Sequence, residues 1–369
     1  MSDPWQTLRL AREQRRQAGL VRTLRPVPAG VLDLASNDYL ALSRHPEVLA
    51  AASRALDDHG AGATGSRLVT GTTVLHGGLE LALARRTGAQ AGLVFSSGYL
   101  ANLGAVGVLA GPGTLVVSDA GNHASLIDAC RLSRAQVVVV PHGDPDAVAA
   151  TLARHRGPSL VVTDAVFSVD GALAPLPDLL RVVRRAGGLL LVDEAHALGV
   201  LGAGGGGACV AAGLQDAPEL VRTVTLSKSL GSQGGAVLGP ALLRDTLVDT
   251  ARAFVFDTGL APSACAAALA ALGLVDDALV ARLQAVNADL AAAVGVPPTP
   301  GAVVRVPVGD AHGALAAQAR LLADGLAVGC FRPPSVAHGQ SCLRLTARAD
   351  LRPADLVRAG GLVRAAVRT

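Results

Sequence analysis

Short aliphatic runs recur between residues 93 and 192, each bounded by glycine or polar residues and followed by a longer stretch with helical spacing. Uninterrupted apolar runs of this length are typical of strands buried on both faces, as in a parallel sheet. Their alternation with helical stretches indicates consecutive strand-helix-strand units. We therefore predict an α/β fold with a central, mostly parallel sheet flanked by helices. The runs lie at 93–95, 115–117, 137–140, 160–162 and 189–192.

The two ends of the chain carry different patterns. Leucine, valine and alanine spaced among arginines over residues 5–25 predict an amphipathic helical arm. Residues 31–40 predict a short strand that enters an Asn-Asp turn. From about residue 275, helical stretches mix with short strands such as 302–306, which predicts a smaller α+β domain. At 369 residues, two or three domains are expected: an N-terminal arm over 1–46, a large domain over 47–274 and a small C-terminal domain over 275–369.

Composition narrows the classes of function. A net charge of +3 and an aromatic content of 2% argue against a nucleic-acid partner. Five scattered cysteines show no spacing for zinc or disulfides, so we expect no metal site and reduced thiols in a cytoplasmic protein. The first residues lack the apolar core of a secretory signal. The charge-free run 258–275 is mostly alanine, which favours a buried helix between domains over a membrane span.

A glycine-rich segment at Gly60–Gly65 fits G-x-G-x-x-G but lacks the context of a dinucleotide site. A helical pattern over 46–59 precedes it instead of a strand, and Glu80, at the position of the expected acidic residue, falls within the next helix. It is not a Walker A loop either, because Ser66 and Arg67 follow Gly65. We interpret the segment as backbone that lines the active site.

The chain contains a single lysine, Lys228, among 32 Lys and Arg residues. Arginine replaces lysine in most surface roles, but it does not lose its proton near neutral pH to act as an amine nucleophile or base. Lys228 therefore indicates carbonyl chemistry through a Schiff base. Composition drift that spared one lysine explains the count equally well, so the neighbouring motifs have to decide.

The apolar run Leu189–Val192 leads directly into Asp193, with His196 three residues later. Asp193 is then predicted at the carboxyl end of a buried strand, where open α/β sheets bind ligands. A carboxylate there and a lysine on a later loop are two groups that pyridoxal phosphate requires. The carboxylate keeps the pyridine nitrogen protonated, and the lysine binds the aldehyde. Asp-Glu-Ala-His alone also fits an ordinary strand end, but its pairing with Lys228 is a strong signal.

Taken together, Asp193-Glu-Ala-His196 and Thr225-Leu-Ser-Lys228-Ser-Leu-Gly-Ser-Gln-Gly-Gly235 resemble the α-oxoamine synthases, a pyridoxal phosphate family of fold type I. The likeness runs from about Leu20 to Arg348. It implies a homodimeric acyltransferase that condenses an amino acid with an acyl thioester and releases carbon dioxide. The closest likeness within the family implies L-alanine and a pimeloyl thioester as substrates, carried by coenzyme A or an acyl carrier protein.

The resemblance also assigns residues around the cofactor. Lys228, Asp193 and His123 are the implied catalytic residues, with His123 stacked on the pyridine ring. Gly98 and Tyr99 follow a predicted strand and begin a predicted helix, where backbone amides favour a phosphate. Thr225 matches a further phosphate ligand, Thr258 matches one that reaches the neighbouring subunit's phosphate, and two residues, Ser168 and His196, match positions near the phenolic oxygen.

Four more positions match substrate contacts of the family. Asn37 and Arg344 correspond to residues that hold the amino-acid carboxylate, for which a forked guanidinium is suited. Thr346 corresponds to another substrate contact. Arg22 corresponds to an arginine that meets the far carboxylate of the pimeloyl group, although Arg25 is close enough to leave the register open. Solvated surface arginines are the alternative interpretation for Arg22 and Arg344.

Other functions remain open from the residues alone. Within the family, glycine C-acetyltransferase uses glycine and acetyl-CoA, and serine palmitoyltransferase is a more distant alternative. A nucleotide-binding module built on Gly60–Gly65, in which Lys228 has no role, is an alternative of another class.

Overall fold

The computed structural model describes residues 3–367. The outermost residues of the predicted arm and C-terminal domain, at 1–2 and 368–369, lie outside this range. The chain forms two compact units. The large unit comprises 37–168 and 172–284, and the small unit comprises the remaining described residues. The predicted domain boundaries stay predictions; in the structure, the residues up to Ser36 group with the C-terminal residues from Ala285 onward.

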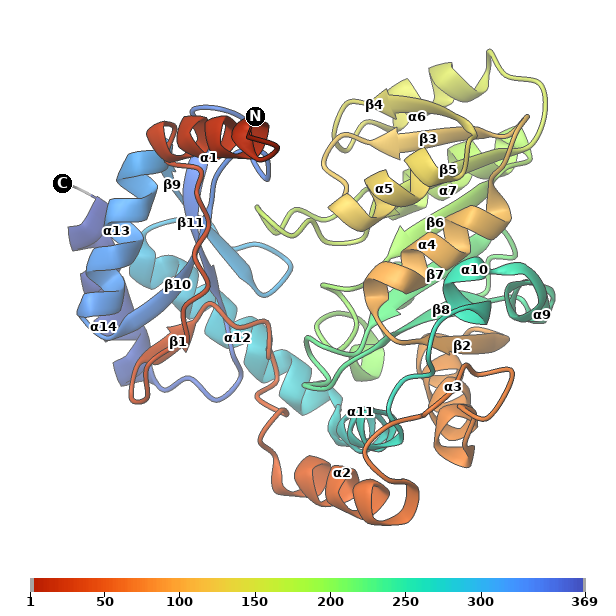
Figure 1. Cartoon of the computed structure of the whole chain (residues 1–369), viewed down its shortest axis with the longest axis horizontal. Coiled ribbons are helices and arrows are strands. Elements are labelled where there is room, and N and C mark those ends of the chain that lie inside the picture. The colour runs from red at the N-terminus through yellow and green to blue at the C-terminus, as the bar shows by residue number, and fades with distance from the viewer. Residues whose placement is uncertain (1–2, 368–369) are drawn as a thin grey trace. The chain divides into compact units, whose positions relative to one another are not determined.

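The large unit is built on a sheet of seven strands in the order β2-β8-β7-β6-β5-β3-β4 (Figure 1). The strands β7, β6, β5, β3 and β4 run parallel to one another, whereas β8 runs antiparallel to both β7 and β2. The predicted α/β fold with a mostly parallel sheet is confirmed. The strands are β2 (Ala91–Phe95), β3 (Leu115–Asp119), β4 (Gln136–Val140), β5 (Ser159–Asp164), β6 (Leu189–Asp193), β7 (Leu220–Thr225) and β8 (Gly235–Gly239).

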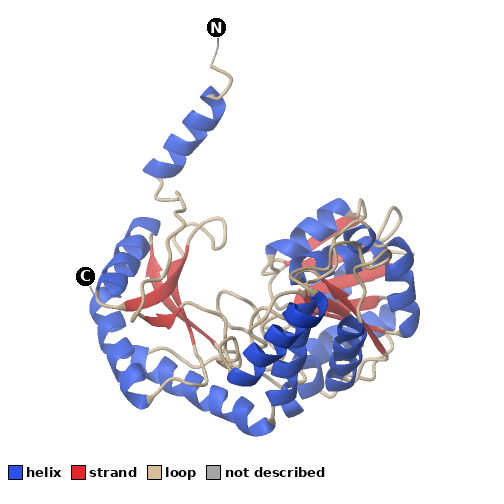
Figure 2. Cartoon of the chain, turned by 60° about the horizontal axis from the view of Figure 1, so that its bottom comes forward, coloured by secondary structure: helices blue, strands red, loops and turns tan. Residues whose placement is uncertain are grey.

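Alternate strand residues feed two separate apolar cores, one on each face of this sheet. On β5, Val161 packs with α6 and α7, while Leu160 and Val162 pack with α4 and α5 on the opposite face. Both faces are therefore covered, as the uninterrupted apolar runs required, and Figure 2 shows the strands between helices. The helices on these faces are α4 (Gly98–Leu109), α5 (Ala124–Leu132), α6 (Pro145–Leu152), α7 (Leu176–Ala186), α8 (Ala208–Ala211), α9 (Ala241–Thr250) and α10 (Arg252–Val255), and the short η1 (Ala203–Gly205) precedes α8.

Three further helices pack together at the β2 end of the large unit: α2 (Pro46–His59), α3 (Val74–Thr87) and α11 (Pro262–Leu274). Helix α11 lies in the charge-free run and buries seven of its residues, so the predicted buried helix is present. Among the described residues, no single helix is long and apolar enough to cross a membrane. Only the pair α11 and α12 (Asp277–Val294), bent by 86°, passes that test by length and composition.

The small unit contains a four-stranded sheet in the order β1-β10-β11-β9, with β1 parallel to β10 and the other pairs antiparallel. Helices and strands mix here, as the sequence pattern from residue 275 predicts. The strands are β1 (Leu32–Leu34), β9 (Val303–Gly309), β10 (Leu326–Phe331) and β11 (Ser341–Thr346), and the helices are α1 (Gln6–Gln17), the second part of α12, α13 (Ala311–Ala323) and α14 (Pro353–Val367).

The prediction of one helical arm over residues 5–25 is wrong in its extent. Helix α1 ends at Gln17, and Gly19 adopts a positive φ of 66°. The amide of Gly19 bonds to the carbonyl of Arg16, and that of Leu20 bonds to Arg15, so the last carbonyls are capped by a reversal of the chain. The segment from Leu20 to Gly30 forms no helix, which places Arg22 beyond the helix end.

Candidate active site

The parallel strands of the large unit end in polar residues at one edge of the sheet. Asp164 ends β5, Asp193 ends β6 and Thr225 ends β7. Asp164 pairs in register with Asp193, and Asp193 pairs with Thr223. Because carboxyl ends of parallel strands form the ligand-binding edge of open sheets, these residues mark the candidate site.

Lys228 lies half-buried in the loop after β7 and contacts a residue of the predicted set. Its Nζ is 2.8 Å from Nε2 of His196, and Nδ1 of His196 is 2.6 Å from the hydroxyl of Tyr39. The Tyr39 hydroxyl is in turn 3.4 Å from Oδ1 of Asn37. The structure therefore joins Lys228, His196 and Asn37 through Tyr39, a fully buried residue that sequence reasoning missed.

The protonation of Lys228 dictates the direction of these hydrogen bonds. A protonated Nζ can only donate, so Nε2 of His196 accepts and Nδ1 carries the ring proton. Nδ1 then donates to Tyr39, whose own proton turns toward Asn37. When Nζ is neutral it can accept a hydrogen bond from Nε2, and the chain reverses. His196 and Tyr39 therefore form a path that responds to a proton change on the lysine.

Asp193 is buried and held at both carboxylate oxygens. Oδ2 accepts a hydrogen bond of 2.7 Å from Nδ2 of Asn102, and Oδ1 accepts one of 2.9 Å from the amide of Ala195. Sequence reasoning missed Asn102. The available signal was that Asn102 is an amide within the otherwise apolar run of α4.

His123 is the N-cap of α5, and its side chain is accessible at the surface of the chain. Partial desolvation by the surrounding protein is the main cause that lowers its pKa; the negative charge of Asp193 opposes this, and the positive charge of Lys228 adds to it. The backbone amide of His123 bonds at 3.4 Å to Oδ1 of Asp164, the register neighbour of Asp193. An accessible imidazole with a lowered pKa is suited to act in its neutral form.

Helix α4 begins beside the end of β7. A Cβ atom at Gly98 would lie 3.1 Å from Cβ of Thr225 and 3.2 Å from its hydroxyl oxygen. The first cap bond of the helix goes from the amide of Leu100 to Ser97, so the amides of Gly98 and Tyr99 precede it and point outward from the helix start. These amides and the Thr225 hydroxyl lie together where an anion is favoured. The phenol of Tyr99 donates to Asp128 at 2.5 Å.

Asp164 adds a second carboxyl beside Asp193. Burial is the main cause that raises its pKa well above the usual range, and the charge of Asp193 raises it further. Within the described residues, Oδ2 of Asp164 is buried with no hydrogen-bond partner. An orphaned buried oxygen of this kind beside Asp193 is expected where a group binds.

Two other predicted cofactor residues lie in loops of the large unit. Ser168 is half-buried four residues after β5. Thr258 is exposed and forms a bridge with Ser66, which joins its loop to the chain that follows the glycine-rich segment. The glycine-rich segment Gly60–Gly65 lies between α2 and α3, with no strand before it. The strand that a dinucleotide site requires is therefore not there.

The predicted substrate residues of the small unit lie in two places, on β11 and around a cavity. Arg344 on β11 is buried, with its guanidinium 4.6 Å from the ring centre of Phe331. Thr346 on the same strand is buried, and its hydroxyl has no hydrogen-bond partner among the described residues. Arg22 and Arg25 both line a cavity of about 500 Å³, so the structure keeps the register between them open.

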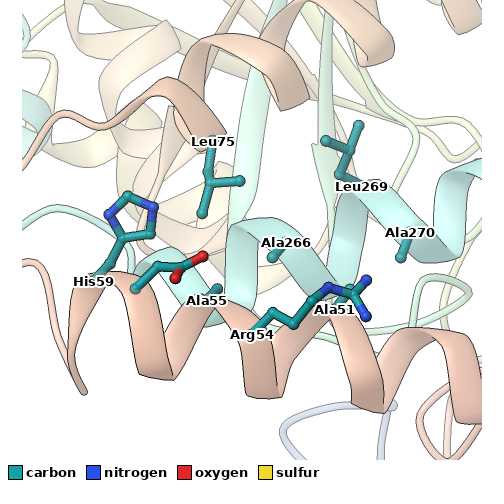
Figure 3. A pocket seen from close by; sticks show the side chains of 9 residues that line it. Ala51, Arg54, Ala55, His59, Leu75, Ala266, Leu269 and Ala270 are labelled. Atoms are coloured by element: carbon teal, nitrogen blue, oxygen red, sulfur yellow. The ribbon is translucent and has the colours of Figure 1, made fainter.

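A separate hollow of about 320 Å³ lies over α2, α3 and α11 (Figure 3). It is lined mostly by alanine and leucine, together with Arg54, Asp58 and His59. It contains none of the predicted site residues. We therefore place the candidate active site at the strand ends and not in this hollow.

Comparison with known proteins defines the class. Residues 29–360 match the family described as aminotransferase class I and II, and the chain belongs to that family. Among solved structures, SPT with a PLP internal aldimine has a TM-score of 0.92 at 29% identity, covering 100% of this chain and 99% of that one. Serine palmitoyltransferase of Sphingomonas wittichii has a TM-score of 0.91 at 30% identity, covering 100% and 98%. The predicted fold type I is confirmed.

The sequence relatives narrow the class to 8-amino-7-oxononanoate synthases, and the chain is an enzyme of that group. It is 60% identical to the 8-amino-7-oxononanoate synthase of Mycobacterium sp. (strain KMS) over 350 residues, 93% of this chain and 92% of the relative. The synthase of Mycobacterium marinum is 57% identical over 365 residues, 96% of this chain and 92% of the relative. The crystal structure from Francisella tularensis has a TM-score of 0.78 at 25% identity, covering 92% and 99%.

Proposed function

We propose that this enzyme condenses L-alanine with a pimeloyl thioester, with loss of carbon dioxide, to give 8-amino-7-oxononanoate for biotin synthesis. The observation that carries the proposal is the identity of 57% to 60% with 8-amino-7-oxononanoate synthases over more than nine tenths of both chains. The arrangement of Lys228, His196 and Asp193 at one sheet edge supports it from the chemistry of the residues. The predicted cytoplasmic location is part of the same proposal.

The cofactor is pyridoxal phosphate, and the described residues fit its parts. The amides at the start of α4 and the hydroxyl of Thr225 would hold the phosphate, and Asp193 would hold the pyridine nitrogen. The accessible ring of His123 would contact the face of the pyridine, with His196 and Ser168 toward the phenolic oxygen. When bound, the cofactor joins amines through its aldehyde and withdraws electrons from the adjacent carbon. The orphaned oxygen of Asp164 fits a site that is completed by a ligand.

Lys228 would act as the amine that binds the cofactor and as the base that moves the Cα proton of alanine. Nε2 of His196 lies 2.8 Å from Nζ of Lys228. It can accept a hydrogen bond from a protonated Nζ and donate one to a neutral Nζ. Tyr39 and Asn37 extend this chain, so the same residues that adjust to the lysine's charge would orient the amino acid. Arg344 and Thr346 of the small unit stay predicted substrate contacts through the resemblance.

The exposed apolar surface of the large unit supports a homodimer. Leu68, Val69 and Val74 are 52%, 79% and 82% exposed, and Phe256 is 72% exposed. The bridge between Ser66 and Thr258 brings their two segments together. An apolar group of this kind on a soluble enzyme marks an interaction surface. A second copy on this surface would cover it and place the exposed Thr258 beside the partner's cofactor.

Glycine C-acetyltransferase activity is the second candidate, because the residues at the lysine do not choose between amino acids. A panel of alanine, glycine and serine against pimeloyl, acetyl and palmitoyl thioesters separates the candidates. We expect turnover with alanine and pimeloyl thioester to exceed every other pair. Faster turnover of glycine with acetyl-CoA would overturn the assignment. Comparing pimeloyl-CoA with the pimeloyl acyl carrier protein identifies the donor.

Reduction with borohydride tests the cofactor link independently. Because Lys228 is the only lysine, label should appear on one peptide, Thr225–Gly231, and the visible absorbance should vanish. Lys228→Arg keeps the charge but should take no label, since arginine stays protonated. Label on another peptide would contradict the role of Lys228.

A further inference from the structure

Asn102 forms hydrogen bonds with three side chains in and around the candidate site. It is 2% exposed on α4, and its side chain uses both of its ends. Nδ2 is 2.7 Å from Oδ2 of Asp193 and 2.8 Å from Oγ of Ser125, while Oδ1 is 2.6 Å from Oγ1 of Thr223. Since a carboxylate only accepts, Nδ2 must be the atom that faces Asp193, and this fixes the orientation of the amide.

The first consequence concerns the direction in which the Asp193 carboxylate points. Asn102 holds one oxygen, and the amide of Ala195 holds the other at 2.9 Å. Two donors on different segments prevent the carboxyl group from rotating about its χ2 bond. Thr223 neighbours Asp193 in the sheet register, and its hydroxyl donates to Oδ1 of Asn102. This hydrogen bond fixes the side-chain amide of Asn102 in turn.

The second consequence concerns the proton on His123. Oγ of Ser125 accepts from Asn102, which leaves the hydroxyl proton free to donate to Nδ1 of His123 at 2.8 Å. The amide of Ser125 also approaches Nδ1, at 3.2 Å. With two donors directed at Nδ1, the neutral ring carries its proton on Nε2. Asn102 therefore reinforces, through the Ser125 hydroxyl, the tautomer of His123 that the Ser125 amide already favours.

Helix geometry places Asn102 suitably for both tasks. Asn102 lies four residues after Gly98, roughly 6 Å further along α4 and on the same face of the helix. One helix face thus presents the amides beside Thr225 and, one turn later, the side chain that holds Asp193.

We propose that Asn102 is a positioning residue that aligns Asp193 with the cofactor's pyridine nitrogen and, through the hydroxyl of Ser125, reinforces the Nε2-protonated form of His123. The proposal rests on the proposed function for the identity of the cofactor. A buried asparagine that merely stabilises the fold would satisfy the same hydrogen bonds. It would not, however, couple its effect to Asp193, and this difference can be measured.

The test is a double-mutant cycle between Asn102→Leu and Asp193→Asn, read by the dissociation constant of pyridoxal phosphate and by its visible circular dichroism. Hydrogen bonds to charged groups are worth roughly a tenfold to hundredfold change in an equilibrium. In the wild-type background, Asn102→Leu should weaken cofactor binding about tenfold and remove at least half of the dichroism. In the Asp193→Asn background, the same replacement should change binding less than about twofold, because the group it positions is gone.

Controls separate this from loss of fold. Asn287, 1% exposed in the small unit, is also a buried asparagine with a hydrogen bond to a carbonyl, and Asn287→Leu measures the general cost of removing one. It should lower the melting temperature without changing the dichroism. If Asn102→Leu does not fold, Thr223→Val removes only the outer hydrogen bond and should change the dichroism in the same direction to a smaller extent. Ser125→Ala should leave cofactor affinity within about twofold but shift the pH profile of turnover.

Equal losses from Asn102→Leu in both backgrounds, or unchanged dichroism with only a lower melting temperature, would overturn the proposal. Failure of the proposed function looks different, because wild-type protein would then bind no pyridoxal phosphate or would not turn over alanine with the thioester.

Discussion

At the scale of single residues, Asp164 should make the stability of the folded protein depend on pH, and this can be measured without the cofactor. Burial and the charge of Asp193 raise its pKa in the folded protein, while the amide of His123 and the charge of Lys228 oppose the shift. The folded state therefore keeps its proton at pH values where the unfolded chain has released it. Stability is lost as pH rises from the ordinary carboxyl range toward the folded pKa.

Asp164→Asn should remove this loss. We expect the melting temperature of the variant apoprotein to gain on that of the wild type as pH rises from about 4 to 7, by a few degrees in total. Calorimetry across this range measures it. Asp178, an exposed carboxylate paired with Arg181, supplies the control replacement, which measures the effect of removing a surface carboxylate. Parallel curves for Asp164→Asn and wild type would show that Asp164 titrates normally.

Arg22 and Arg25 pose a specific question because both line the same cavity of the small unit. A pimeloyl thioester ends in a carboxylate, and a guanidinium that pairs with it contributes roughly 1.5 to 3 kcal/mol. Arg22→Ala should therefore raise KM for the thioester and lower kcat/KM about tenfold to hundredfold. Spectral titration with alanine should be unchanged.

Arg25→Ala and the exposed Arg12→Ala on α1 are the matched comparisons for this prediction. If Arg25→Ala gives the larger loss of kcat/KM, the register of the resemblance is shifted by three residues. Equal and small effects in all three variants would show that these arginines are solvated surface residues without a role in binding the thioester.

The residues differ in how far the sequence predicted them. Lys228 and Asp193 stand out because one is the only lysine and the other ends a buried strand. Tyr39 reaches His196 across 157 positions of sequence, and Asn102 reaches Asp193 across 91. Pairs that distant carry no local periodicity or spacing, so only folding reveals them. Tyr39 did offer one signal, since it is one of two tyrosines in the chain.

At the scale of elements, the start of α4 has to approach β7 closely. Gly98→Ala would place a methyl group 3.1 Å from Cβ of Thr225, closer than ordinary contact, and would push the first amides away from its hydroxyl. We expect the dissociation constant of pyridoxal phosphate to rise on the order of tenfold. Fluorescence titration of the apoprotein provides the measurement.

Gly107 lies in the same helix and is a matched control. A Cβ atom there meets nothing within 4 Å, so Gly107→Ala should stabilise α4 by about 0.5 to 1 kcal/mol through helix propensity and leave cofactor binding unchanged. If both replacements leave the affinity unaltered, the helix start does not hold the phosphate.

Elements with regular patterns were predictable, and those that depend on distant pairing were not. The aliphatic strands and α2 follow from apolar spacing and length, because tertiary contacts reinforce what the local pattern favours. The N-terminal helix was predicted eight residues too long, because the positive φ of Gly19 outweighs the apolar pattern that continues beyond it. The parallel pairing of β1 with β10 joins segments almost 300 positions apart, for which a three-residue strand gives no signal.

At the scale of the whole molecule, the proposed dimer makes a prediction about assembly and cofactor together. A charge placed at Val69 would be buried if a second copy covers this surface, and such burial is strongly unfavourable. Val69→Asp should therefore raise the dimer dissociation constant about hundredfold or more. Sedimentation velocity over a range of protein concentrations measures this.

Leu242 on α9 is 78% exposed, comparable to Val69, and supplies the matched surface control. Leu242→Asp should leave the dimer intact. Because Thr258 is proposed to serve the partner's phosphate, cofactor affinity of Val69→Asp should fall on dilution and recover at high protein concentration, which a defect confined to one chain would not do. A monomeric wild type at micromolar concentration, or equal weakening by Leu242→Asp, would place the subunit contact elsewhere or remove it. Affinity that stays independent of concentration in a dissociating variant would separate Thr258 from the cofactor while leaving the dimer itself in place.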